Sequence, residues 1–184
     1  MIAGDWLFSK GFGLGGQYDE EIVRILAQYC ADIAVSEFDQ LDHVLDLTTS
    51  PEDYLSIVRG KTAGPFAAGS QVAGMIAGLS KEQALPLRRF GMDFGIAFQL
   101  VDDLLDLRGD ERMGKPRGAD VIEGKMTLPL IHALTLSHGE KRQRLAQIIE
   151  NFTDDCFDEL MALLNHSDSL HYAEILVRTH LERA

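Results

Sequence analysis

The chain has 184 residues, enough for one domain with a sizeable core, and its 46% hydrophobic and 25% charged residues are ordinary for a soluble globular protein. Its formal net charge of −12 argues against a nucleic-acid partner, because phosphate backbones select basic surfaces. Two cysteines are too few for a disulfide framework, and the opening MIAGDWLFSK lacks the basic and apolar regions of a signal peptide, so we expect a reduced, cytoplasmic protein.

The sequence predicts an all-α fold, because helix start signals recur while sustained strand alternation and Asn-Gly hairpin turns do not. Ser50 followed by Pro51 is a typical helix start, and Ser80 with Gln83 has the spacing of a capping box. We expect the polar stretch 109–124 to be a functional or mobile loop. The predicted helices span about 1–11, 19–46, 51–78, 81–108, 126–137, 139–152, 154–165 and 168–184.

Both ends of the chain have the pattern of interrupted helices. MIAGDWLF begins without a capping residue, and HYAEILVRTHLERA stops while its amphipathic pattern is still running. Since no repeat and no domain boundary is visible, we expect residues 1–184 to form a single partial domain of a longer chain. The alternative is a short natural chain with frayed termini.

Residues 62–80 carry no charge and approach the length of a membrane span. A proline, several glycines and a shortage of large aliphatic side chains favour a buried core helix with no membrane span. Pro65 has no N–H, so the Lys61 carbonyl lacks its usual helical donor. We therefore expect a kink there, with carbonyl oxygens near Lys61 and Thr62 facing a cavity.

Several polar side chains share one face of the helix predicted at 81–108. At i, i+3, i+4 and i+7 these are Gln99, Asp102, Asp103 and Asp106. The other directions, from Phe94 to Leu107, are apolar, so we expect a helix buried nearly all round with one polar stripe.

Asp102 and Asp106 are expected one helical turn apart, where two carboxylates in a cavity repel each other. Mg²⁺ prefers oxygen ligands and commonly takes one or two carboxylates together with waters and substrate phosphates. The stripe therefore predicts a Mg²⁺ site that faces a phosphate-bearing ligand. The alternative is a solvated run of charges at a helix end.

Positive side chains that suit such a ligand occur in two places. Lys115 and Arg117 belong to the loop after the stripe, and Lys125 follows it closely. Lys61 is the last charge before the uncharged segment, where the alternative is a lysine that extends to solvent at the rim.

Five segments resemble motifs of the trans-prenyltransferases of the polyprenyl diphosphate synthase family. FQLVDDLLD (98–106) resembles the family's second aspartate-rich motif, and KTAGPF (61–66) resembles its Lys-Thr motif. The others are GKPRGADVIEGKMTLPLI (114–131), AGDWLF (3–8) and EFDQL (37–41), and their order and approximate spacing agree with the family from residue 3 to about 137.

The resemblance implies an isoprenoid-synthase-type helical bundle around a central cavity, incomplete at both ends. It also implies Mg²⁺-dependent condensation of an allylic diphosphate with isopentenyl diphosphate, giving a longer trans-polyprenyl diphosphate. Members are usually homodimers, which here would use helices within 1–46.

The resemblance also implies roles for individual residues. Asp102, with Asp106 and Asp103, would ligate Mg²⁺ on the allylic diphosphate. The lysines that would contact that diphosphate are Lys61, Lys115 and Lys125. Thr62 and Gln99 would steady the allylic cation and, with Lys61, form the catalytic set.

Three departures from the family pattern leave other functions open. The first aspartate-rich motif and the basic residues for isopentenyl diphosphate do not occur in these 184 residues. Ala119 also stands where the family commonly has asparagine. A non-catalytic subunit of a heteromeric prenyl diphosphate synthase and a terpene cyclase on the same fold are the alternatives.

Overall fold

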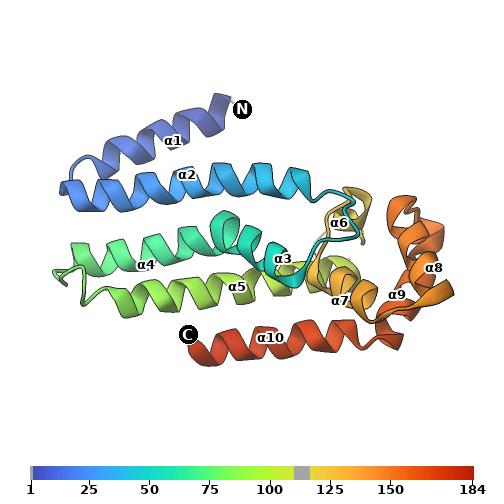
Figure 1. Ribbon diagram of the computed structural model, residues 1–184. Helices are drawn as coiled ribbons and strands as arrows, with labels where there is room; N and C mark the ends of the chain where they lie inside the picture. Colours follow the sequence, from blue (N-terminus) through green and yellow to red (C-terminus); the bar gives the residue numbers. More distant parts are fainter. Residues whose placement is uncertain (1, 110–116) are drawn as a thin grey trace.

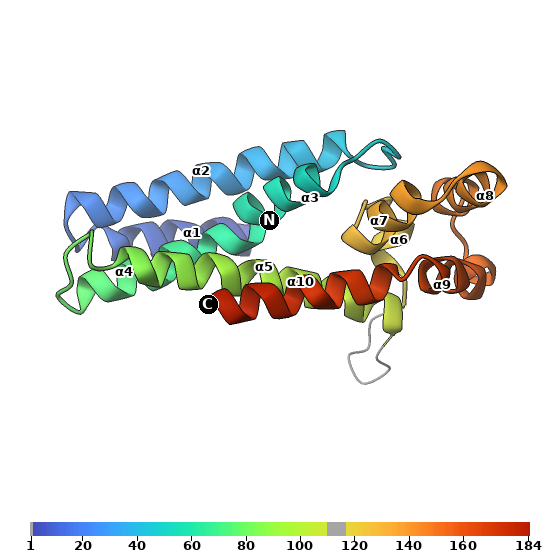
Figure 2. The ribbon, with the colours of Figure 1, turned by 60° about the horizontal axis from the view of Figure 1, so that its bottom comes forward.

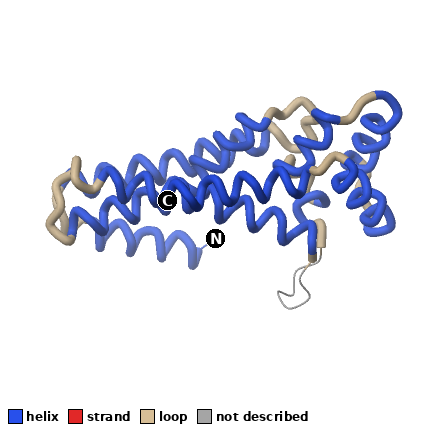
Figure 3. The backbone as a smooth tube through the Cα atoms, turned by 90° about the horizontal axis from the view of Figure 1, so that it is seen from below, coloured by secondary structure: helices blue, strands red, loops and turns tan. Residues whose placement is uncertain are grey.

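The computed structural model describes residues 2–109 and 117–184, and within these ranges every regular element is helical (Figures 1 and 3). The α-helices are α1 (Ile2–Gly15), α2 (Glu20–Asp42), α3 (Pro51–Val58), α4 (Gly64–Ile76), α5 (Leu85–Arg108), α6 (Ala119–Ile122), α7 (Leu128–Leu136), α8 (Gly139–Glu150), α9 (Phe157–His166) and α10 (Ser169–Arg183). A π-helical turn, Arg59–Ala63, joins α3 to α4, and a 3₁₀ turn, Asp154–Cys156, precedes α9. The predicted all-α class is confirmed.

The long helices run side by side and the short ones gather at one end of the bundle. In Figure 2 α2, α4, α5 and α10 extend along the molecule, while α6 to α9 lie together at the end opposite the α4–α5 turn. α5 is central, since it packs against both α4 and α10. Among the described residues, no helix combines the length and the apolar character that crossing a bilayer requires.

Much of the hydrophobic core lies between α5 and the helices that follow it. Its fully buried members include Leu100, Leu107, Leu128, Ile131, Leu145, Ile148, Leu160 and Leu164. Burying a side chain of this size contributes roughly 1.5–3 kcal/mol, so this cluster anchors the C-terminal half of α5. The two cysteines, Cys30 and Cys156, are free and only half-buried.

α4 and α5 approach closely because glycines face the contact. A Cβ atom added to Gly91 would lie 2.3 Å from the Phe66 carbonyl oxygen, and one added to Gly95 would lie 2.5 Å from Ala63 Cα. Both neighbours are backbone atoms, which cannot move aside cheaply. The close contact therefore fixes α5 against the π-helical turn, one helical turn before Gln99.

The helix predicted at 51–78 is interrupted, as its proline suggested. Ser50 and Asp53 form a reciprocal capping box at the start of α3, with Pro51 in the first turn. After Val58 the chain makes a π-helical turn, in which the Gly64 N–H donates to the Arg59 carbonyl five residues back. Pro65 then falls in the first turn of α4, where a missing N–H costs little.

The π-helical turn changes which residues reach the core. Tyr54, Ile57 and Val58 are buried, and the next fully buried position is Ala63, five residues after Val58 rather than four. An uninterrupted α-helix would have turned the residues at 61 or 62 inward instead. The interruption leaves Lys61 and Thr62 half-buried at a cavity wall.

α5 differs from its prediction at its start and on one face. The Ser80–Gln83 bonds form, but the helix begins only at Leu85, because Pro86 favours the first turn. The expected burial nearly all round is wrong on one side of the helix. The exposed side chains there are Leu87, Phe90, Phe94, Phe98, Val101 and Leu105, which are 36–51% exposed.

Candidate active site

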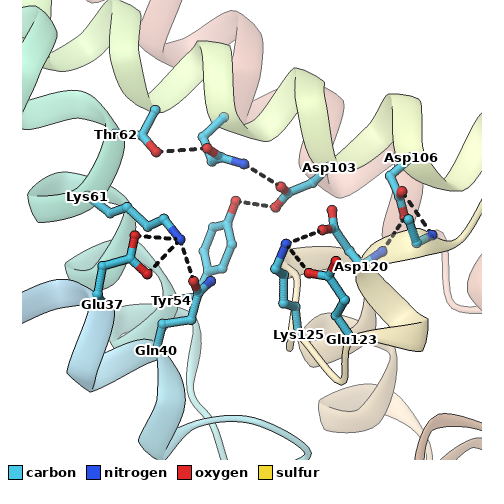
Figure 4. A network of polar contacts seen from close by, with 12 residues as sticks. Glu37, Gln40, Tyr54, Lys61, Thr62, Asp103, Asp106, Asp120, Glu123 and Lys125 are labelled. Atoms are coloured by element: carbon cyan, nitrogen blue, oxygen red, sulfur yellow. Dashed lines mark hydrogen bonds and ion pairs between the residues drawn. The ribbon is translucent and has the colours of Figure 1, made fainter. Parts of the chain in front are cut away.

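A cavity of about 200 Å³ lies where α2, α3, the π-helical turn and α5 meet the segment between α6 and α7. The residues predicted from the sequence that line it are Lys61, Thr62, Gln99, Asp102, Asp103 and Lys125. The fold therefore brings together side chains from three separate sequence segments. Figure 4 shows the polar network around this cavity.

Lys61 is held by the C-terminal part of α2. Its Nζ lies 3.0 Å from a Glu37 carboxylate oxygen and donates a 2.7 Å hydrogen bond to Gln40 Oε1 (Figure 4). Both partners belong to the EFDQL segment, which was noted in the sequence only as a motif. The Lys61 side chain is 32% exposed, so it is positioned at the cavity and still accessible to an anion.

A chain of hydrogen bonds links α5 to the π-helical turn and to α3. The Thr62 hydroxyl donates to Gln99 Oε1 at 2.8 Å, and Gln99 Nε2 donates to Asp103 Oδ1 at 2.8 Å. Tyr54 donates its hydroxyl to Asp103 Oδ2 at 2.6 Å. Because the Asp103 carboxylate accepts from the amide nitrogen, the Gln99 oxygen is turned toward Thr62.

Asp103 is the most deeply buried of the three aspartates, with 3% exposure. Burial raises its pKa to about 7, although hydrogen bonds from Tyr54 and Gln99 act in the opposite direction. Burial, and secondarily the charge of Asp103, also raises the pKa of Tyr54. No sequence pattern pointed to Tyr54, which lies 49 residues before Asp103.

Asp102 and Asp106 have different surroundings. Asp102 lines the cavity and is half-buried. Asp106 accepts hydrogen bonds from the amides of Ala119 and Asp120, at 3.0 and 3.2 Å, and so holds the N-terminal end of α6. Burial and the nearby Asp120 charge raise the pKa of Asp106. Across residues 2–109 and 117–184, no three His, Cys, Asp or Glu side chains converge as a metal-binding group.

Lys125 is the second lysine of the cavity. Its Nζ lies 2.7 Å from Asp120 Oδ1 and 2.7 Å from Glu123 Oε2. Burial disfavours its charge, but the hydrogen bonds that it donates to the two carboxylates outweigh that effect and raise its pKa. Asp120 was not singled out as a site residue from the sequence, although it falls within the motif at 114–131.

Of the two remaining basic candidates, Arg117 does not join this network. Arg117 lies over the Phe157 ring, 4.3 Å from its centroid, and 3.9 Å from Asp158 on α9. Lys115 is outside the described residues.

These features define a class of helical proteins. This all-helical bundle, in which carboxylates and lysines share a cavity beside the central helix, has the isoprenoid synthase fold, as its match to two solved structures shows. The polyprenyl synthase of Caulobacter crescentus, solved with calcium and isoprenyl diphosphate, matches 99% of this chain with a TM-score of 0.92 and 34% identity, over 57% of its own length. A polyprenyl synthase from Roseobacter denitrificans matches all of this chain with a TM-score of 0.90 and 36% identity, over 61% of its length.

The chain belongs to the polyprenyl synthetase family, whose model matches residues 1–165. The octaprenyl diphosphate synthase of Haemophilus influenzae is 33% identical over 187 aligned residues, which cover all of this chain and 57% of that protein. An all-trans-nonaprenyl-diphosphate synthase of Rhodobacter capsulatus is 34% identical, again over 57% of its length. This chain thus spans little more than half the length of these curated relatives.

Proposed function

We propose that this chain is part of a Mg²⁺-dependent trans-polyprenyl diphosphate synthase, and that its cavity binds the allylic diphosphate. The reaction condenses the allylic diphosphate with isopentenyl diphosphate. The observation that carries the proposal is that Lys61, Thr62, Gln99, Asp102 and Lys125 line one cavity. Under this proposal residues 1–184 are one portion of a single isoprenoid-synthase domain.

The donor set fits a divalent cation. Asp102 and Asp103 both line the cavity, and Mg²⁺ commonly uses only one or two carboxylates together with water and phosphate oxygens. Asp106 is assigned as a further ligand, since its oxygens keep acceptor capacity beyond the two amides. When bound, Mg²⁺ supplies charge neutralisation for the leaving diphosphate.

The lysines then bind the diphosphate directly. Lys61 and Lys125 each present an ammonium group held in place by carboxylates, and Lys115 is proposed as a third contact. Donors fixed before the substrate arrives need little reorganisation as negative charge develops on the leaving group.

Thr62 and Gln99 are assigned the role of stabilising the allylic carbocation that forms when the diphosphate leaves. Gln99 Oε1 accepts from Thr62, and Asp103 holds the amide nitrogen, so the amide dipole has a fixed direction. The second lone pair of that oxygen stabilises positive charge on the allylic carbon after the diphosphate departs. Tyr54 acts through Asp103 and is therefore a positioning residue, while Asp103 orients the Gln99 amide in addition to its proposed place in the donor set for the cation.

Equilibrium binding of geranyl diphosphate to the 184-residue chain tests the proposal. We expect saturable binding that requires Mg²⁺, disappears with a chelator, and weakens about tenfold or more in Asp102→Asn. Asp158→Asn is the matched control, because its side chain is 94% exposed on α9. If the affinity for geranyl diphosphate depends neither on Mg²⁺ nor on Asp102, the assignment of this cavity as the allylic diphosphate site is refuted.

We also propose a homodimer formed through α1 and α2. Exposed apolar side chains on these helices support it, among them Trp6, Phe8, Val35, Phe38 and Leu41, which are 57–71% exposed. Light scattering should give twice the monomer mass, and Phe38→Asp should shift the chain toward monomer. A wild-type monomer at high concentration would exclude this interface.

A further inference from the structure

His43 is a titratable residue of the cavity that the proposed reaction has not used. It is the C-cap residue of α2, and it lines the same cavity as Lys61 and Lys125. Its side chain is 28% exposed. The carbonyl end of a helix favours positive charge, so a protonated imidazole is well placed there.

The hydrogen bonds around His43 determine which ring nitrogen carries its proton. The Thr49 hydroxyl donates to the Asp46 carbonyl oxygen at 2.7 Å, which uses its only proton. Thr49 Oγ1 therefore acts as acceptor for His43 Nδ1, 3.1 Å away. Nδ1 must carry a hydrogen, so Nε2 of the neutral ring is an unprotonated acceptor.

An unprotonated Nε2 cannot bind a phosphate oxygen, because both atoms are acceptors. A second proton makes Nε2 a donor and gives the ring a positive charge. Within the described residues, no hydrogen bond or ion pair engages Nε2.

The charges around the ring are mixed and mainly acidic. The Asp46 carboxylate lies 3.5 Å from Nδ1, and Asp53 on α3 interacts with His43 electrostatically. The other charged groups of the cavity are Lys61, Asp102, Asp103, Asp120 and Lys125. Both lysines are paired with carboxylates, so their repulsion of an imidazolium is partly offset.

We propose that His43 is a further diphosphate-binding residue, which takes up a proton at Nε2 as the anion enters and then donates to a phosphate oxygen. The proton comes from solvent and forms the Nε2–H bond, and no other covalent bond forms or breaks. This inference rests on the proposed diphosphate site. Under this inference, binding of the diphosphate is coupled to the uptake of one proton by His43.

The first experiment needs no ligand. In ¹⁵N-histidine NMR spectra of the 184-residue chain, recorded at a pH high enough for the ring signals to be those of neutral imidazole, His43 should appear as the Nδ1–H tautomer. His43→Gln assigns the signal by removing it. An Nε2–H tautomer would overturn the inference regardless of diphosphate binding.

The second experiment adds Mg²⁺ and inorganic pyrophosphate. Both ring nitrogens should become protonated, and titration calorimetry in buffers of different ionisation heat should show more proton uptake by wild type than by His43→Gln. The variant should also bind about tenfold more weakly, as expected for loss of a hydrogen bond to a charged group. His43→Lys should restore affinity without the extra proton uptake.

His171→Gln is the matched control, because His171 is 56% exposed on α10 and does not line the cavity. It should leave both affinity and proton uptake unchanged. Equal uptake and equal affinity in wild type and His43→Gln would overturn the role of His43 while leaving the diphosphate site intact. Failure of the wild type to bind pyrophosphate would instead refute the proposed site, and the inference with it.

Discussion

The hydroxyl of Tyr54 donates a 2.6 Å hydrogen bond to the carboxylate of Asp103, and this contact joins α3 to α5 beneath the cavity. Both side chains are buried, with 6% and 3% exposure. A buried carboxylate that loses a donor bears an uncompensated desolvation cost. The pair therefore matters to the stability of the cavity as well as to its shape.

Tyr54→Phe should lower the free energy of unfolding by about 1–3 kcal/mol, because one oxygen of Asp103 is left without its donor. Urea denaturation at neutral pH measures the change. Tyr18→Phe serves as control, since Tyr18 is 48% exposed. An unchanged transition midpoint in Tyr54→Phe would show that the hydrogen bond contributes little.

Asp103 should also make stability depend on pH. Burial raises its folded pKa to about 7, from an ordinary value of 3.8. Between these values the folded chain holds a proton at this site that the unfolded chain has lost, so the contribution of Asp103 to stability falls as pH rises. Measured without metal, Asp103→Asn should gain stability relative to wild type from about pH 4 to pH 8. If the difference in unfolding free energy between Asp103→Asn and wild type stays constant across that pH range, the raised pKa of Asp103 is contradicted.

Gly95→Ala should destabilise the chain by about 1–3 kcal/mol, because its new methyl group would overpack the contact between α5 and the π-helical turn. The Cβ would lie 2.5 Å from Ala63 Cα, which is backbone. Gly69→Ala is the matched control in α4, where nothing lies within 4 Å of an added Cβ. That control should gain roughly 0.5–1 kcal/mol from helix propensity. Equal effects of the two substitutions in thermal denaturation would argue against the close contact.

Lys61→Met should weaken Mg²⁺-pyrophosphate binding about tenfold or more, through loss of a charged donor. Its effect on stability should stay within about 1 kcal/mol, since the ion pair with Glu37 is partly exposed and such pairs contribute little. Lys81→Met removes a similarly paired lysine, 52% exposed, that does not line the cavity. If both variants bind pyrophosphate alike, Lys61 does not contact it.

The 184-residue chain alone should not elongate an allylic diphosphate, although it should bind one. Its described residues present one group of cavity carboxylates, whereas catalysis needs both reactants held in attack geometry, which contributes about 7–11 kcal/mol when fully realised. Product chromatography after incubation with Mg²⁺, geranyl diphosphate and isopentenyl diphosphate provides the test. Elongation at ordinary enzymatic rates would contradict this expectation, and a hydrocarbon product would identify a cyclase.

The sequence predicted those features that depend on local signals. Ser50 caps α3 because its side chain and that of Asp53 need only neighbouring amides. The helical period placed Gln99, Asp102 and Asp103 at one cavity, and the proline anticipated the break after Val58.

Features that depend on distant partners were not predictable in this way. Periodicity tells which residues share a helix face, but it does not tell which element covers that face. Phe98 was therefore expected to be buried and is 51% exposed. For the same reason the sequence did not reveal that Asp106 would face the amides of α6, or that Asp103 would pair with Tyr54.

The π-helical turn at Arg59–Ala63 has a consequence in genetic terms. A π-turn contains about one residue more than an α-turn, so a one-codon deletion there can be absorbed by conversion to continuous α-helix. Such an allele would keep the helices on both sides, yet the retained residues of the turn would be rotated by about 100° relative to one flank. It should produce a folded protein that has lost its lysine contact, which is a different phenotype from that of an unfolded truncation.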